Sequence, residues 1–295
     1  MVSRLRPHQL GLLMGVAGYT VISFESFGIR VAGLGEWDTA FWFGLFTAIA
    51  MSMLVPARTG RSLPSAVKDG GWVMVASGIL QAMSTIFFIL AIQFTTVSNA
   101  VVIFAATPVL AALVAHVVLK ERTSTRMWMA IAASIVGILI VMSGSFGEGR
   151  ISGDLFAVGA ISAYTANLTI WRKNRELRRT VAIGLGGLVM AVVSALFADP
   201  TTVTLKAVLI LLLLGGLMGP AGRVSVASST RYLPTAQVSL LGPIETLGAT
   251  AWAWLFLAEA PAGTTLVGGG IVLTAVLYGA ASGLRGMRVP VNVAG

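Results

Sequence analysis

The chain has 295 residues, of which 56% are hydrophobic, 11% are charged and none is cysteine, with a formal net charge of +9 and a mean hydropathy of +0.89. Soluble domains carry about 25% charged residues, so this composition excludes an ordinary soluble protein and indicates an integral membrane protein. The lack of cysteine excludes disulfides and thiolate metal sites.

Apolar runs long enough to cross a bilayer recur along the whole chain. A spanning helix needs about 20 apolar residues, and links rich in Gly, Pro, Asp and Ser separate the runs. The first run follows a basic start, is too long for a signal-peptide core and has no evident cleavage site, so we expect it to persist as the first span. The predicted spans, in chain order, are 9–31, 36–55, 71–94, 97–119, 126–144, 153–172, 180–198, 206–230, 234–258 and 264–284.

The basic residues indicate how these spans are oriented. With ten spans, sixteen Lys and Arg fall on the side that holds both termini, and three (Arg30, Arg150 and Lys206) fall on the other. Positive residues collect in cytoplasmic loops, so we expect a multi-pass membrane protein with both termini in the cytoplasm. The same distribution accounts for the positive net charge through topology and contact with anionic lipid, without a nucleic-acid partner.

The two halves of the chain resemble each other in the placement of polar residues. A shift of 138 positions places SNAVVIFAATPVLAALVAHVVLKER (98–122) on AQVSLLGPIETLGATAWAWLFLAEA (236–260), with Thr107 on Glu245. A shift of 142 positions places the first span on the sixth, with Glu25 on Asn167. Random pairing of apolar segments would seldom align polar residues in this way.

The repeat predicts two units, residues 1–149 and residues 150–295, each with five spans. Because five is odd, the second unit would cross the membrane in the opposite sense. We therefore expect an all-α integral membrane protein with ten transmembrane helices arranged as two inverted five-helix repeats. Inverted repeats are an architecture of transporters, in which the substrate site lies near the midplane and access alternates between the two sides.

Two stretches within the spans combine glycine and proline with a charge. LLGGLMGPAGRVS contains Gly219 and Pro220 before Arg223, and LLGPIETLG contains Gly242 and Pro243 before Glu245. Interrupted spans mark the substrate site of inverted-repeat transporters, so we predict hinges at these four Gly and Pro residues. The alternative is that the glycines permit close packing and the prolines produce kinks.

Three ionisable residues, Glu25, Arg223 and Glu245, lie away from the ends of predicted spans, where charged groups face the interior or a wet cavity. An arginine beside carboxylates suits a zwitterion: Arg223 would take a substrate carboxylate, and Glu245 or Glu25 an ammonium group. Alternatively, Glu245 pairs with Arg223 and only ties helices together, or Glu245 exchanges a proton. The other candidate residues of a mixed polar and apolar cavity are Gln81, Ser84, Thr85, Phe88, Asn99, Tyr164, Asn167 and Leu241.

The chain resembles the drug/metabolite transporter superfamily, EamA type. The resemblance rests on 98–121, on LLGPIETLGATAWAWLFLAE, on the endings LKE (119–121) and LAE (257–259), and on GDLFAVGAISAYTANLTIWRK. Two features depart from the family: Thr246 stands where Pro108 would align, and FWFGLFTAIA lacks an arginine common in the second span. The chain is most similar to bacterial amino-acid exporters of the YddG kind. This resemblance implies a location in the bacterial inner membrane and outward transport of aromatic and other neutral amino acids through a central cavity.

Other functions remain open on the sequence alone. A multidrug or lipophilic-cation exporter of the same fold would use carboxylates and aromatic residues without needing Arg223, and a channel-like facilitator is compatible with the repeat. A phosphate-ester carrier would need more basic residues within the spans. We expect no enzyme activity, metal or cofactor, because HExxH, paired intramembrane aspartates and a dinucleotide-binding loop are missing from the sequence. The expected partners are a small-molecule substrate and membrane lipids, and a monomer is compatible with the sequence.

Overall fold

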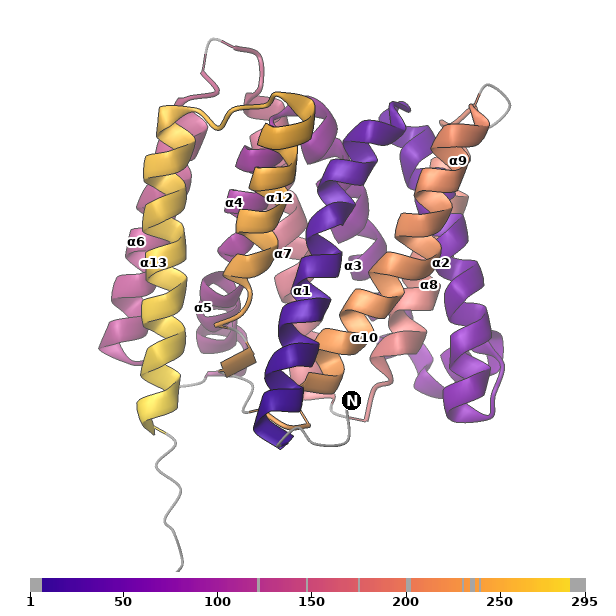
Figure 1. The fold of residues 1–295 in the computed structure, drawn as a ribbon. Helices are drawn as coiled ribbons and strands as arrows, with labels where there is room; N and C mark the ends of the chain where they lie inside the picture. Colours follow the sequence, from indigo (N-terminus) through magenta and orange to yellow (C-terminus); the bar gives the residue numbers. More distant parts are fainter. Residues whose placement is uncertain are drawn as a thin grey trace, which may run out of the picture.

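The computed structural model describes residues 7–120, 123–146, 148–174, 176–199, 203–229, 231–233, 237–238 and 240–286. Within these ranges the chain is helical and contains no β-strand. The helices run side by side as a bundle, with α1 beginning and α13 ending at the same end (Figure 1). The main helices are α1 (Pro7–Ala32), α2 (Glu36–Thr59), α3 (Leu63–Phe94), α4 (Val97–Ala105), α5 (Thr107–Leu119), α6 (Thr125–Ser143), α7 (Ile151–Lys173), α8 (Arg179–Ser194), α9 (Leu205–Leu211), the π-helix η2 (Leu212–Met218), α10 (Gly219–Ser229), α12 (Pro243–Leu257) and α13 (Gly263–Gly286).

Seven helical segments of the described chain are long and apolar enough to cross a membrane, so the protein is a multi-pass membrane protein. They are Pro7–Ala32, Glu36–Ala57, Leu63–Phe94, Val97–Leu119, Thr125–Ser143, Leu205–Val226 and Gly263–Ala280. The other predicted spans also fall on helices. However, α8 and α12 have only 16 and 15 residues, and α7 contains a buried aspartate. The number of spans, ten, therefore stays a prediction.

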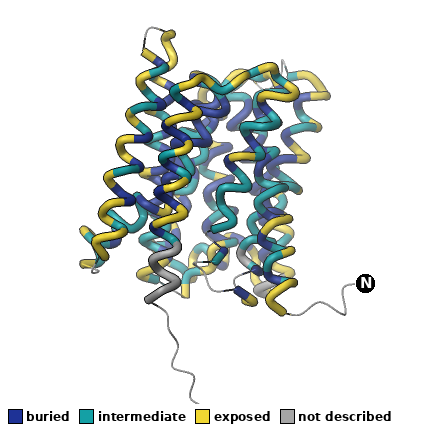
Figure 2. The backbone as a smooth tube through the Cα atoms, turned by 60° about the vertical axis from the view of Figure 1, so that its left-hand side comes forward, coloured by how far each residue is buried: buried dark blue, intermediate teal, exposed yellow. Residues whose placement is uncertain are grey.

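The outside of the bundle carries large apolar side chains. Exposed residues lie along its periphery, and buried residues lie where helices meet (Figure 2). Leu196, Leu205 and Leu255 are 77%, 74% and 69% exposed. Such a belt would be unfavourable in water and is suited to lipid acyl chains.

The strongest helix pairings follow the pattern that an inverted repeat predicts. The helices α2 and α8, which are the second and seventh predicted spans, pack together, as do α6 and α13, the fifth and tenth. The pair α3 and α7 also has a counterpart in the pair α1 and α10 when the two halves are exchanged.

Glycines allow two of these pairs to cross closely and reciprocally. A Cβ at Gly44 would lie 2.8 Å from the Gly187 carbonyl oxygen, and a Cβ at Gly187 would lie 2.9 Å from that of Gly44. Between α6 and α13, a Cβ at Gly137 would lie 2.8 Å from the Gly268 oxygen, and the reverse distance is 2.5 Å. Small residues at such crossings let membrane helices approach backbone to backbone.

A further equivalence between the halves concerns the backbone alone. Among the described residues, Lys120 and Ala258 are the non-glycine residues with positive φ, at 54° and 55°. They stand 138 positions apart, at the C-terminal caps of α5 and α12, and their amides donate to Ala115 and Ala253, which have the same spacing. Because the left-handed conformation is costly for residues with a Cβ, this coincidence supports a structural repeat.

The fourth span of the first half is broken, where the sequence predicted a continuous helix over 97–119. Helix α4 ends at Ala105, and α5 begins at Thr107 with Pro108 in its first turn. The residue before a proline is disfavoured in helical conformation, whereas proline itself is favoured at a helix start. In the second half α12 likewise begins at Pro243, within the bundle rather than at its edge (Figure 1).

Candidate functional site

The predicted hinge around Gly219 and Pro220 is a change of helix type. Leu212–Met218 is a π-helix, and the Gly219 amide donates to the Leu214 carbonyl five residues back. In the same pattern the Gly215 carbonyl would need a donor from Pro220, which has no N–H. The Thr47 hydroxyl of α2 supplies the missing hydrogen bond at 3.1 Å. Segments of π-helix are frequent at functional sites, and here the segment leads directly to Arg223.

Arg223 of α10 forms a two-pronged ion pair with Glu25 of α1. Its Nη1 lies 2.7 Å from Glu25 Oε1, and its Nη2 lies 3.0 Å from Oε2. A Cβ at Gly219 would lie 2.5 Å from Glu25 Oε1 and 2.6 Å from Arg223 Nη1. The glycine therefore makes room for the ion pair, a packing role that the hinge interpretation did not include.

Glu245 lies in the first turn of α12, where the positive end of the helix dipole favours a carboxylate. It interacts electrostatically with Glu25 and Arg223. Within the described part of the chain, no hydrogen bond or ion pair joins its carboxylate to another residue. The alternative in which Glu245 pairs with Arg223 is therefore wrong for this structure, because Glu25 occupies the guanidinium.

Aromatic rings adjoin the charged cluster formed by Glu25, Arg223 and Glu245. Tyr164 of α7 interacts electrostatically with all three members of the cluster. Its ring centroid lies 5.6 Å from that of Phe104, which lies 5.1 Å from that of Phe88. These three aromatic residues are half-buried and come from α7, α4 and α3. Charged and aromatic groups from both halves thus meet inside the bundle.

The exposure of the charged cluster is uneven. The Glu25 side chain is 8% exposed, whereas the Arg223 side chain is 34% exposed. A guanidinium at membrane depth is strongly disfavoured in lipid and is found facing protein or water. The exposed part of Arg223 is therefore suited to a water-accessible space between the helices.

Other predicted site residues satisfy one another across the α3–α7 contact. The Ser77 hydroxyl donates to Asn167 at 2.6 Å, and Asn167 Nδ2 donates to the Gln81 side chain at 3.1 Å. The Ser84 hydroxyl donates to the Ala160 carbonyl at 3.0 Å. These side chains join α3 to α7, and their hydrogen bonds are made within the protein, without a substrate. Thr85 bonds the carbonyl one turn earlier.

The remaining two predicted residues lie in other contacts. The side chain of Leu241 packs against α1, where a Cβ at Gly15 would lie 2.5 Å from its Cδ1. Asn99 belongs to a separate, fully buried polar cluster. Its Nδ2 donates to Ser145 at 3.1 Å and lies 3.4 Å from Asp154 Oδ1, and the Thr265 hydroxyl donates to its Oδ1.

The sequence interpretation missed Asp154, which is fully buried and accepts a hydrogen bond from Thr95 at 2.7 Å. The sequence feature that could have indicated a buried polar contact here is an acidic residue directly after Gly153, at the start of an apolar span. Gly153 is itself required there, because a Cβ would clash with the backbone nitrogen of Thr95. The contact holds the start of α7 against the link between α3 and α4.

The sequence interpretation also did not predict the ion pair between Arg30 and Glu259, which lies at the same end of the bundle as the contact between Asp154 and Thr95. Arg30 Nε lies 3.1 Å from Glu259 Oε1, and Arg30 Nη2 donates to the Thr95 carbonyl at 2.7 Å. The other Glu259 oxygen accepts from the Val97 amide at 3.1 Å. This outer network, defined by Arg30, Thr95, Val97 and Glu259, joins the ends of α1 and α12 to the link between α3 and α4, at the upper end of Figure 1.

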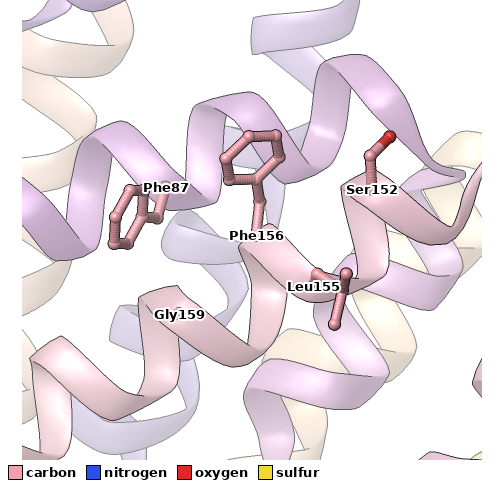
Figure 3. Close-up of a pocket in the computed structure, with 5 residues that line it drawn as sticks. All are labelled: Phe87, Ser152, Leu155, Phe156 and Gly159. Carbon is pink, nitrogen blue, oxygen red and sulfur yellow. The ribbon is translucent and has the colours of Figure 1, made fainter.

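Two surface cavities of the described structure contain none of the predicted site residues. One, of about 300 Å³, lies between Phe87 of α3 and Ser152, Leu155, Phe156 and Gly159 of α7 (Figure 3). Its lining is almost wholly apolar and includes the exposed Leu155, as expected for a lipid-facing groove. The other, of about 260 Å³, is lined by Arg61, Ala66, Asp69, Gly70, Met74, Glu176, Leu177 and Arg178.

Comparisons with known proteins agree with the helical membrane architecture. Residues 9–143, in the first half of the chain, match the EamA-like transporter family. A curated protein from Rhizobium johnstonii, named a riboflavin transporter, is 26% identical over 232 residues, covering 74% of this chain and 73% of its own. A solved structure described only as "Crystal structure of protein" superposes with a TM-score of 0.65 at 17% identity, over 93% of this chain and 99% of its own. The similarity to this solved structure shows a shared fold.

Proposed function

We propose that the whole chain is an EamA-type transporter that moves a small amphipathic solute across the bacterial inner membrane. The observation that carries the proposal is the charged cluster of Glu25, Arg223 and Glu245, held inside an apolar bundle beside a π-helix and a helix start. A purely structural bundle gains little from a carboxylate with no hydrogen-bond or ion-pair partner among the described residues, because an unpaired charge at membrane depth is costly. The family match of residues 9–143 independently favours transport.

The proposed mechanism is alternating access by two inverted five-helix repeats. The exchanged helix pairs, the reciprocal glycine crossings and the matched caps at Lys120 and Ala258 support the repeat. Two halves of similar structure and opposite orientation can adopt each other's conformation, so that a site between them opens to one side and then to the other. The outer network of Arg30, Thr95, Val97 and Glu259 would hold one end closed.

The proposed topology places both termini in the cytoplasm, with ten spans. It is supported by the distribution of basic residues. It is also supported by the start of α1 and the end of α13, which lie at the same end of the bundle (Figure 1). Outward transport follows only from the resemblance to amino-acid exporters of the YddG kind. The outer network would then lie on the periplasmic side.

Aromatic solutes that carry an amino group, including amino acids with large neutral side chains, are the first candidate substrates. Phe88, Phe104 and Tyr164 offer aromatic surface beside the charged cluster, and Glu245 offers a partner for an amino group. Riboflavin, a planar aromatic solute, is a second candidate, because the Rhizobium johnstonii relative carries that name.

Reconstitution into liposomes tests the proposal. Proteoliposomes loaded with unlabelled phenylalanine, tryptophan, riboflavin or a lipophilic cation would be diluted into the matching radiolabelled compound, and counterflow would be measured. We expect counterflow of at least one aromatic solute above that of protein-free liposomes, with competition from the unlabelled compound. Equal signals with and without protein for all four solutes would contradict the proposal.

A further inference from the structure

The charges of the cluster do not balance. Arg223 contributes one positive charge, and Glu25 meets it with both oxygens, at 2.7 and 3.0 Å from the two terminal nitrogens. The pair is therefore neutral as a unit. Glu245 adds a carboxylate that has no hydrogen-bond or ion-pair partner among the described residues. With both acids ionised, the cluster carries one net negative charge inside the bundle.

The zwitterion hypothesis required Arg223 to bind a substrate carboxylate, and the geometry leaves little room for this. A guanidinium has five N–H donors in a fixed fork, and the Glu25 carboxylate takes one from each terminal nitrogen. The backbone at Gly219 covers part of the same group, since a Cβ there would lie 2.6 Å from Nη1. A second carboxylate would also meet repulsion from Glu25 and Glu245.

We infer that Glu245 binds the ammonium group of the substrate, and that the site prefers aromatic amines lacking a carboxylate over the corresponding zwitterionic amino acids. This deepens the proposed function and rests on it. A cation neutralises the net negative charge of the cluster, whereas a zwitterion leaves that charge unchanged and brings a further carboxylate into the cluster. The aromatic part of the substrate would stack near Tyr164, Phe104 and Phe88, whose ring faces also attract cations.

Equilibrium binding to the purified full-length protein in detergent tests the inference without depending on transport. The probes form a matched set with one phenyl ring: phenethylamine, phenylalaninamide, phenylalanine and 3-phenylpropionate. A charge-assisted hydrogen bond without competing repulsion is worth roughly a 10- to 100-fold change in affinity. We expect the two amines to bind at least about tenfold more tightly than phenylalanine, and 3-phenylpropionate to bind most weakly.

Two variants isolate the carboxylate. Glu245→Gln removes the charge and keeps the shape, and should abolish the preference for amines. Glu148→Gln is the matched control, because Glu148 pairs with Arg150 at the surface, where both side chains are about half exposed, and it should leave all four affinities unchanged. Phenylalanine binding as tightly as the amines to the wild-type protein would overturn the inference, even if Glu245→Gln failed to fold. An unchanged preference in folded Glu245→Gln would also overturn it.

The counterflow experiment separates this inference from the proposed function. For this comparison phenethylamine joins the counterflow panel. Amine binding that depends on Glu245, without counterflow of phenethylamine or of the other four solutes, would leave the inference standing and contradict transport. Counterflow of phenylalanine, with no preference for amines in the binding experiment, would support transport and overturn the inference.

Discussion

Replacing Gly219 by alanine should displace the ion pair inside the bundle. The added Cβ would lie 2.5 Å from Glu25 Oε1 and 2.6 Å from Arg223 Nη1, closer than these atoms can approach without movement. Overpacking of a close-packed interior costs about 1–3 kcal/mol, and separating a buried pair costs about 3–5 kcal/mol. Because Arg223 is 34% exposed, we expect the lower part of this combined range.

The matched control is Gly216→Ala, in the π-helix that directly precedes Gly219. There the nearest atom to the added Cβ is Leu212 Cδ1 at 3.3 Å, the end of a flexible side chain. Both variants share the gain in helix propensity from Gly to Ala, about 1 kcal/mol, so their difference reports the clash.

Thermal unfolding in detergent, followed by size-exclusion chromatography, measures the effect. Gly219→Ala should melt at a clearly lower temperature than both the wild type and Gly216→Ala. Equal melting temperatures for the two variants would refute the assignment of Gly219 as the residue that makes room for the ion pair.

Three further predictions concern contacts that tie the bundle together. Thr47→Val keeps the shape of the side chain but leaves the Gly215 carbonyl without its 3.1 Å donor, so it should lower the free energy of unfolding by about 1–3 kcal/mol; unchanged denaturant unfolding would contradict this. Lys120→Gly and Ala258→Gly place glycine, which tolerates left-handed backbone, at positions with φ of 54° and 55°. Each should therefore raise the free energy of unfolding by up to about 1 kcal/mol, measured as a higher melting temperature. A loss of stability at only one of the two positions would argue against equivalent caps. Arg30→Gln and Glu259→Gln should be non-additive by about 0.5–3 kcal/mol in a double-mutant cycle of thermal stability, because their side chains lie 3.1 Å apart; simple additivity would show that the contact contributes nothing.

The apolar runs predicted where the helices lie because the bilayer sets a length that composition alone reveals. The break at Ala106 was missed although Thr107-Pro108 signalled it, since the apolar run continues through the break. The π-helix was not predicted. The Gly215 carbonyl within it accepts a hydrogen bond from Thr47 of another helix, and a contact between distant segments cannot be read from an apolar run.

The ionisable residues of the site were identified from the sequence, but their partners were not. Arg223 had two candidate carboxylates, and it pairs with Glu25, next to the space that Gly219 leaves between the helices. In the same way, the sequence predicted that Gln81 and Asn167 would be available to a substrate. In the structure α3 packs against α7 in a register that joins the two side chains by a 3.1 Å hydrogen bond. Hydropathy contains no information about such pairings.

The most direct test of the alternating-access account is to lock the outer network. The chain has no native cysteine, so Arg30→Cys/Glu259→Cys can be cross-linked with a reducible bifunctional thiol reagent in proteoliposomes that show counterflow. The account predicts that cross-linking stops counterflow and that reduction restores it, while either single-cysteine variant is unaffected by the reagent. Continued counterflow at the original rate, with the cross-link fully formed, would contradict the account.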